Sequence, residues 1–278
     1  MLVDPQLGEL VLDAENGYIV QEIDLGFPEP RPDVVTRVAA NGARDYTMFY
    51  GPRVVSMTLM VLDGYTPKRV ALDRLRAYTS PGRRPVLYFN DMDGSAPDRR
   101  IRLRGESLGS PLVSLDYSEV HVQWSAPDGV IEDARERTVA VPATPGREPG
   151  RRYPRTYPIR YPAQSATGSV TLTCEGLEPA APLFRLWGPC VTPRLYNLTS
   201  GLVLTLPGVS VTAEQYVEVD VREATVQLQG DPGQSLYGSL GFESTMFWLQ
   251  PGVNVLRYVP VSYGQPSRAE VIYRDAWI

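Results

Sequence analysis

Short stretches of the sequence alternate apolar and polar residues, and a period of two is typical of β-strands with one buried face. In VVSMTLMVL (54–62), every second residue from Val55 to Val61 is apolar. SEVHVQW (118–124) and SVTLTCEG (169–176) follow the same pattern. Because 24 glycines and 26 prolines punctuate the chain, we predict many short strands, arranged as sandwiches or barrels.

One stretch has the period of a helix. Thr66 can cap a helix and Pro67 suits its first position. The apolar side chains that follow recur at the spacing of one helix face, at Ala71, Leu72, Leu75 and Tyr78. We therefore predict that the first domain is mainly β, with one packed helix near 67–79.

The alternation disappears in the proline-rich stretch PATPGREPGRRYPRTYPIRYP (142–162). Proline fixes its own backbone and disfavours helix at the preceding residue, so this stretch is predicted to be a semi-rigid connector. It would divide the chain into a domain at 1–142, a linker at 143–162 and a domain at 163–278. A basic aromatic arm for single-stranded nucleic acid and a proline-rich peptide ligand are the alternatives.

The charge distribution disfavours nucleic-acid readout. Residues 1–142 carry 16 basic and 21 acidic side chains, a net charge of −5, whereas residues 143–278 carry 11 of each. Neither part has the basic excess that is typical of nucleic-acid binding. Lys68 is the one lysine among 27 basic residues, and we interpret the arginine bias as the mark of a high-GC host.

The sequence offers little for catalysis or metal binding. His121 is the only histidine and lies on a predicted strand, and no phosphate-binding loop or nucleophile elbow is present. NDMDGSAPD (90–98) begins like a calcium loop but lacks the downstream glutamate, so it is interpreted as a turn. We expect no catalytic, cofactor or metal site and no enzymatic activity. Cys174 and Cys190 are expected to be reduced and packed. One disulfide between them is the alternative.

No apolar run approaches the ~20 residues that a membrane-spanning helix needs. The N-terminal MLVDPQLGEL lacks the basic and apolar regions of a signal peptide. We therefore expect that the chain does not insert into a membrane. We expect it to be synthesised in the cytosol.

The stretch FWLQPGVN (247–254) predicts a hairpin turn. Its alternation points Phe247 and Leu249 to one side and Trp248 to the other, and both sides are expected to be buried. Pro251 and Gly252 supply a turn in which glycine takes a positive φ. Asn254 can bond the turn backbone. We interpret Trp248, Pro251, Gly252 and Asn254 as structural residues.

A succession of motifs in the second half carries a more specific signal. GPCVTPRLYNLTSGLVLTLPG (188–208) is followed by YVEVDVREATVQLQG (216–230), by LGFESTMFWLQPGVNVLRY (240–258) and by the terminal VIYRDAWI. This succession resembles the distal tail proteins, or Dit family, of siphoviruses. The single helix and the strand that ends in VQWSAPDG (122–129) make the first half resemble that family too.

The resemblance implies an architecture and partners. The N-terminal domain would be a tail-tube-like β fold and the C-terminal domain a galectin-like β-sandwich. Six copies would form a ring that joins the tail tube to the tip of the virion, after assembly in the host cytoplasm. The implied partners are the major tail tube protein, the tape measure protein and a tail-associated tip protein, with a host surface glycan as a further candidate.

Charges suggest where copies of the chain could meet. A ring requires one patch to contact a different patch on the neighbour. We predict that the strand with Arg99, Arg100, Arg102 and Arg104 contacts the acid-rich IEDARER (131–137) of the next copy. Solvated charge is the alternative interpretation of both stretches.

Two other function classes stay open. A carbohydrate-binding module that adsorbs to the host cell surface is compatible with a sandwich and four tryptophans. A hydrolase of polysaccharide or peptidoglycan is disfavoured because no catalytic constellation is recognisable.

Overall fold

The computed structural model describes residues 1–31, 34–36, 41, 43–45, 49–63, 67–90, 98–109, 112–113, 117–144 and 168–278. The chain forms two compact units. Unit 1 comprises Met1–Ala134 and Trp277–Ile278, and unit 2 comprises Arg135–Ala276. Both units are built from antiparallel strands, which confirms the prediction of a mainly β fold. No helix in the described ranges has the length and apolar character that crossing a membrane would require.

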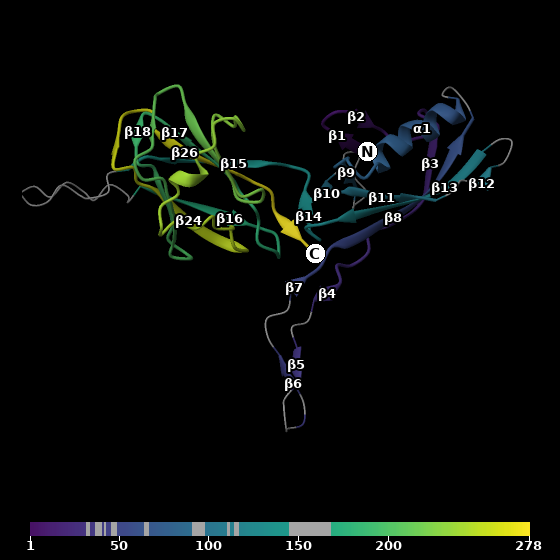
Figure 1. The fold of residues 1–278 in the computed structure, drawn as a ribbon, viewed down its shortest axis with the longest axis horizontal. Coiled ribbons are helices and arrows are strands. Elements are labelled where there is room, and N and C mark those ends of the chain that lie inside the picture. The colour runs from purple at the N-terminus through teal and green to yellow at the C-terminus, as the bar shows by residue number, and fades with distance from the viewer. Residues whose placement is uncertain are drawn as a thin grey trace, which may run out of the picture. The chain divides into compact units, whose positions relative to one another are not determined.

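Unit 1 contains two larger sheets (Figure 1). The first has the order β2-β1-β9-β10-β14-β27, and the second has the order β11-β13-β8-β3, with β12 also pairing with β13. The strands of the first sheet are β1 (Leu2–Asp4), β2 (Gly8–Leu10), β9 (Val86–Phe89), β10 (Arg99–Arg102), β14 (Ile131–Asp133) and β27 (Ala276–Trp277). Those of the second are β3 (Tyr18–Asp24), β8 (Arg53–Leu62), β11 (Arg104–Leu108), β12 (Leu112–Val113) and β13 (Tyr117–Ala126).

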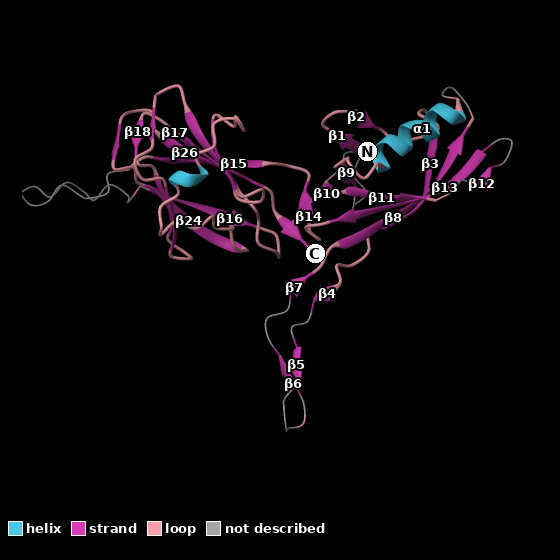
Figure 2. Ribbon diagram, in the orientation of Figure 1, coloured by secondary structure: helices cyan, strands magenta, loops and turns pink. Residues whose placement is uncertain are grey.

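Helix α1 (Lys68–Thr79) is the one α-helix of the described residues and packs on β8, β11 and β13 (Figure 2). Its buried face contains the predicted Ala71, Leu72, Leu75 and Tyr78. The helix begins one residue after Pro67, where the Asp63 carboxylate accepts a hydrogen bond from the Lys68 N–H at 3.1 Å. Thr66, the expected cap, lies outside the described residues. The core side of the second sheet is the alternating set of β8 and β13, at Val55, Met57, Leu59, Val61, Val120, Val122 and Trp124.

A hairpin lies in the chain between β3 and β8 and forms two separate two-stranded sheets. Strand β4 (Pro30–Arg31) pairs with β7 (Phe49–Tyr50), and β5 (Val34–Thr36) pairs with β6 (Ala43–Asp45) (Figure 1). The two pairs follow one another along the same hairpin, so the β4–β7 pair forms its base.

Unit 2 is a sandwich of two sheets around one core. One sheet has the order β15-β26-β17-β22-β23, the other has the order β16-β24-β19-β20, and a small sheet has the order β21-β18-β25. The first contains β15 (Arg137–Pro142), β17 (Leu183–Trp187), β22 (Tyr216–Asp220), β23 (Thr225–Leu228) and β26 (Arg268–Tyr273). The other two contain β16 (Ser169–Cys174), β18 (Cys190–Val191), β19 (Arg194–Asn197), β20 (Leu202–Thr205), β21 (Ser210–Val211), β24 (Gly252–Tyr258) and β25 (Ser262–Tyr263), and a short 3-10 helix spans Tyr237–Ser239.

The division of the chain differs from the prediction in two ways. The boundary lies between Ala134 and Arg135, not at Pro142, because β15 pairs along its whole length with β26 of unit 2. Both strands that flank the proline-rich stretch, β15 and β16, belong to unit 2, so this stretch does not separate the two units. Most of the predicted linker (145–162) lies outside the described residues. The last two residues belong to unit 1, not to the C-terminal sandwich.

Candidate assembly surface

Strand β3 ends the second sheet of unit 1 and leaves aliphatic side chains uncovered. Ile19, Val20 and Ile23 are 41%, 39% and 39% exposed. Val20 pairs with Leu59 and Ile23 pairs with Met57, so both lie on the core side of the sheet. Burying such a side chain fully contributes ~1.5–3 kcal/mol. The edge strand therefore carries apolar surface that unit 1 does not use.

Helix α1 covers only the start of β3, which explains why the side chains farther along this edge strand are exposed. Tyr18, at the start of β3, is buried and donates a hydrogen bond from its hydroxyl to the Ala71 carbonyl of the helix at 2.8 Å. The helix packs on β8, β11 and β13. Farther along β3, Val20 and Ile23 keep their exposure. An edge strand with exposed apolar residues is a template for pairing with another chain.

Exposed aromatic side chains lie at the base of the hairpin, which follows β3 in the chain. Phe27 and Phe49 are each 65% exposed, and Tyr50 is 48% exposed. The rings of Phe27 and Tyr50 meet edge to face, with centroids 6.0 Å apart. We define the assembly surface as Val20, Ile23, Phe27, Phe49 and Tyr50. The sequence did not lead us to any of these residues.

A buried arginine fixes the base of the hairpin. Arg53 is 2% exposed, and its Nε donates to the Gly129 carbonyl at 3.1 Å and its Nη1 to the Gly26 carbonyl at 3.3 Å. Gly26 has a φ of 60°, and a Cβ there would lie 2.3 Å from the Val54 carbonyl oxygen, so only glycine fits. Burial lowers the pKa of the Arg53 guanidinium. The Arg53 side chain therefore ties the segment that follows β3 to the start of β8.

The face of the second sheet away from the helix carries a group of polar side chains. Ser56 and Thr58 of β8 pair with Gln123 and His121 of β13, and these four side chains share this face. Thr58 Oγ1 lies 3.0 Å from His121 Nδ1, and His121 is exposed. His121 thus lies on an open polar face, where it contacts a hydroxyl and, at 3.6 Å, the Glu119 carboxylate.

The structure separates the four arginines that were predicted to form one interface strand. Arg99, Arg100 and Arg102 lie on β10 in the first sheet, whereas Arg104 begins β11 in the second. Leu103 between them is buried and its N–H bonds the Pro85 carbonyl, which breaks the run. The single strand that alternation predicted is therefore wrong.

Arg99 and Arg100 contact side chains of the same unit. Arg100 Nη2 lies 2.6 Å from Glu132 Oε2, with side chains 12% and 5% exposed. Glu132 belongs to the acid-rich stretch that was expected to contact a neighbouring copy. The Arg99 guanidinium lies 3.6 Å from the ring centroid of Trp277, which belongs to the same unit. These contacts stabilise unit 1, so the charge pairing predicted between copies occurs here within one chain.

In unit 2 the predicted hairpin residues surround a tight turn. Gly252 has a φ of 84°. Asn254 is buried, accepts a hydrogen bond from the Gln250 N–H at 3.1 Å and donates to the Gln250 carbonyl at 2.7 Å. Phe247 and Leu249 are buried, but Trp248 is 39% exposed, so only one side of this stretch is buried. Pro251 is exposed.

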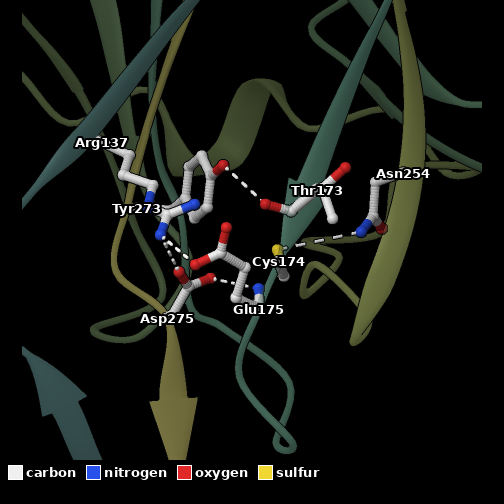
Figure 3. Close-up of polar contacts among 7 residues, drawn as sticks. All are labelled: Arg137, Thr173, Cys174, Glu175, Asn254, Tyr273 and Asp275. Atoms are coloured by element: carbon white, nitrogen blue, oxygen red, sulfur yellow. Dashed lines mark hydrogen bonds and ion pairs between the residues drawn. The ribbon is translucent and has the colours of Figure 1, made fainter.

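A polar cluster joins the ends of three strands of unit 2 (Figure 3). Asp275 is buried, its Oδ1 accepts from the Glu175 N–H at 2.9 Å, and its Oδ2 lies 2.9 Å from Arg137 Nη2. Arg137 also donates to Glu175 Oε2 at 2.7 Å, and this bond raises the pKa of Arg137. The Tyr273 hydroxyl donates to the Thr173 carbonyl at 3.2 Å. The cluster ties the first and last strands of unit 2 to β16.

Both cysteines are buried and free. Burial raises the pKa of the Cys174 thiol to about 12 and also raises that of Cys190. Cys190 Sγ lies 3.2 Å from the Tyr258 hydroxyl. Such thiols pack as small apolar groups. Within the described ranges no three His, Cys, Asp or Glu side chains converge as metal ligands. Most of the loop at 90–98 lies outside these ranges.

Comparisons with known proteins concern the fold. No family model matches the sequence, and no curated protein is significantly similar to it. The structure aligns with the Dit protein (gp 19.1) of phage SPP1, described as a paradigm of hub adsorption apparatus in Gram-positive infecting phages. The alignment covers 100% of this chain and 98% of that one, with a TM-score of 0.65 and 14% identity. The chain has a Dit-like fold.

A second structure supports the same Dit-like fold. A chain of the phage P2 baseplate, in its activated conformation with calcium, aligns over 92% of this chain and 90% of its own length. The TM-score is 0.51 and the identity is 10%. Neither likeness gives support to the expectation of a high-GC host.

Proposed function

We propose that this protein is a structural component of a phage tail tip that assembles with copies of itself into a ring. The observation that carries the proposal is the assembly surface on a Dit-like fold. Its apolar edge strand and hairpin base have no covering element in the described part of unit 1. A second copy of the chain would cover them.

The geometry of the second sheet favours a ring over a two-fold dimer. The sheet ends in β3 on one side and in β11 on the other, and these two edges differ. Pairing of β3 with β11 of the next copy is a heterologous contact, which closes into a ring when the rotation between copies is regular. The polar face with Ser56, Thr58, His121 and Gln123 would then line a water-filled channel, as the alternation of buried and polar positions allows.

The finer assignments extend this proposal by resemblance. The ring would contain six copies and would join the tail tube to the tip apparatus of the virion. Its partners would be the major tail tube protein, the tape measure protein and a tail-associated tip protein. Unit 1 would be the tube-like domain and unit 2 the galectin-like one. The role is structural and not enzymatic, and assembly takes place in the host cytoplasm.

The test is the oligomeric state of the full chain by analytical ultracentrifugation and native mass spectrometry. We expect a closed oligomer, six copies by the proposal. The double variant Val20→Asp, Ile23→Asp should be monomeric, because two carboxylates on the edge would be buried without partners. The matched control is Thr171→Asp, Thr173→Asp on edge strand β16 of unit 2, which should assemble normally. A wild-type chain that stays monomeric at its highest soluble concentration, or a control that loses assembly instead, would contradict the proposal.

A further inference from the structure

The two faces of strand β3 carry different chemistry. Val20 and Ile23 lie on the side of helix α1 and are each 39% exposed. Glu22 and Asp24 pair with β8 at positions that face away from the helix, and both are exposed. Among the described residues, the Glu22 side chain has no hydrogen bond or ion pair. Asp24 Oδ1 accepts a hydrogen bond from the Gly26 N–H at 2.8 Å. This edge of the sheet therefore presents aliphatic groups on one side and carboxylates on the other.

The opposite edge of the sheet, strand β11, carries a cation on the same face as these carboxylates. Arg104 is exposed and pairs with Ser125 of β13. Ser125 follows the buried Trp124, so Arg104 and Ser125 point away from the helix. In the described ranges no hydrogen bond or ion pair involves the Arg104 side chain. Glu106 lies at a bulge of β11 and has no pairing position on β13. The β11 edge therefore offers a guanidinium group on the face where β3 carries its carboxylates.

Helix α1 lies over the other face of β11. A Cβ on Gly105 would lie 2.0 Å from the Thr79 carbonyl oxygen at the end of the helix. Because only glycine allows this approach, the end of the helix sits directly on the edge strand. A strand that pairs with β11 from outside would therefore lie next to the helix. This helix is the cover that Val20 and Ile23 lack.

The strand directions allow the two edges to meet. Strands β3, β8, β13 and β11 are antiparallel in succession, so β3 and β11 run in opposite directions. Copies related by rotation in a ring keep these directions and keep the same face inside. Strand β3 of one copy and β11 of the next would therefore pair antiparallel, with their charged side chains on one face. Across the sheet of one copy Asp24 is aligned with Ser107, two pairing positions from Arg104. A stagger of two positions, of the kind that closing a sheet requires, would bring Arg104 opposite Asp24.

We propose that Arg104 of one copy pairs with Glu22 and Asp24 of the next, and that these charges select which edges of the chain bind each other. The proposal rests on the ring proposed above and names the residues that make its contact specific. Two β3 edges would bring carboxylates against carboxylates, so the charges disfavour a two-fold dimer through β3. The contact of β3 with β11 joins opposite charges on one face and covers Val20 and Ile23 on the other.

The experiment uses two variants of the full chain that break the pair from opposite sides. Arg104→Glu reverses the cation. The double variant Glu22→Arg, Asp24→Asn reverses the acidic edge, and the asparagine keeps an oxygen that accepts from the Gly26 N–H. Each variant alone places like charges at every contact of a ring. Each should raise the protein concentration at which half of the chains are assembled by about tenfold or more, as measured by sedimentation velocity.

An equimolar mixture of the two variants separates a charge pair from a general loss of stability. In a ring that alternates the variants, each contact joins either two wild-type edges or two altered edges. Opposite charges then meet at every contact, so the mixture should assemble at the wild-type concentration. Native mass spectrometry should show equal numbers of the two chains in each ring. Mixing would not repair a fold that either substitution had damaged.

The matched control is Glu119→Arg, which reverses a carboxylate on the same face but on β13, between the two edges. It should assemble as the wild type does. Wild-type assembly of both edge variants, a mixture that stays dissociated, or an equal loss in Glu119→Arg would overturn the pairing and leave the ring standing. A wild-type chain that stays monomeric would contradict the proposed function and the pairing together. If an edge variant does not fold, the double-mutant cycle of Asp24→Asn and Arg104→Gln decides, because additive losses of assembly would overturn the pairing.

Discussion

Strand β3 of unit 1 and strand β16 of unit 2 both end a sheet, but they expose different side chains. On β3 the exposed residues are the aliphatic Ile19, Val20 and Ile23 together with the polar Gln21, Glu22 and Asp24. On β16 the exposed residues are Thr171 and Thr173, which alternate with the buried Leu172 and Cys174. Polar side chains on an edge strand protect it from pairing with other chains, whereas apolar side chains invite such pairing.

The difference follows from what covers each sheet. In unit 2 a second sheet covers the first, and one core fills the space between them. In unit 1 helix α1 packs on β8, β11 and β13. A sheet needs its apolar face covered along its whole width. Unit 2 is therefore covered as a sandwich, whereas the described part of unit 1 leaves the apolar side chains of β3 partly exposed.

The largest expected effect tests whether unit 2 is a closed sandwich. Phe247 is buried against Phe184, with ring centroids 5.1 Å apart. Phe247→Ala should lower the unfolding free energy of unit 2 by ~3–5 kcal/mol, because it removes contacts and leaves a cavity. Its sequence neighbour provides the control, since Trp248→Ala should cost less than ~1 kcal/mol. Urea unfolding of the full chain, followed by hydrogen exchange in each unit, measures both. Equal losses would mean that the core of unit 2 is assigned wrongly.

A second comparison sets a buried ion pair of unit 1 against an exposed one of unit 2. Arg100→Met removes the buried ion pair with Glu132, whose two side chains are 12% and 5% exposed, and should destabilise unit 1 by ~3 kcal/mol. Arg185→Met breaks the more exposed pair with Glu218 and should cost less than ~1 kcal/mol. Thermal unfolding checks both variants. Should Arg100→Met instead leave stability unchanged and abolish assembly, Arg100 would belong to the interface between copies after all.

The two units should also differ in alkaline solution. Burial raises the pKa of Cys174 to about 12 from an ordinary 9.0, and raises that of Tyr18 in unit 1 to about 12 from 10.0. Above the ordinary value the unfolded chain loses its proton while the folded chain keeps it, so stability falls as the pH rises. Both cysteines belong to unit 2, so unit 2 should begin to lose stability above pH 9 and unit 1 only above pH 10.

Hydrogen exchange across this pH range gives the stability of each unit separately. The double variant Cys174→Ala, Cys190→Ala provides the control. In this variant the stability of unit 2 should no longer begin to fall above pH 9. A decline that begins in unit 1 would contradict the assignment of the thiols as the first groups to titrate.

The smallest expected change in stability belongs to the open edge. Ile23→Thr should alter the unfolding free energy of unit 1 by less than ~1 kcal/mol, because the side chain is already 39% exposed. Met57, its cross-strand neighbour, is 3% exposed. Met57→Thr should cost several times more. Calorimetry on both variants measures the contrast, and similar losses would show that Ile23 is part of the core.

The sequence identified the elements whose pattern is local. Alternation located the buried sides of β8 and β13, and the helical period located the buried face of α1. The same reasoning placed Arg99 to Arg104 on one strand, because alternation does not report that Leu103 turns the chain from one sheet to another. It also expected Trp248 to be buried, although exposure depends on whether another element lies above that side.

The assembly surface was beyond sequence reasoning for the same physical reason. YIVQEID (18–24) contains apolar residues on both sides of the strand, and nothing in it says which side a helix covers. The row formed by Trp187, Tyr216 and Arg268 on unit 2 is similar, since these residues lie far apart in the chain. Only the strand register of β17, β22 and β26 makes them neighbours.

By itself the sequence determined a mainly β chain with one helix in its first half and the positions of its turns, because periodicity, glycine φ and proline geometry act over a few residues. The tertiary structure decided which strands pair. It assigned β15 to unit 2, returned Trp277 to unit 1 and left β3 as an open edge. Strand pairing depends on partners that lie many residues away, such as β15 with β26, and no local pattern specifies them.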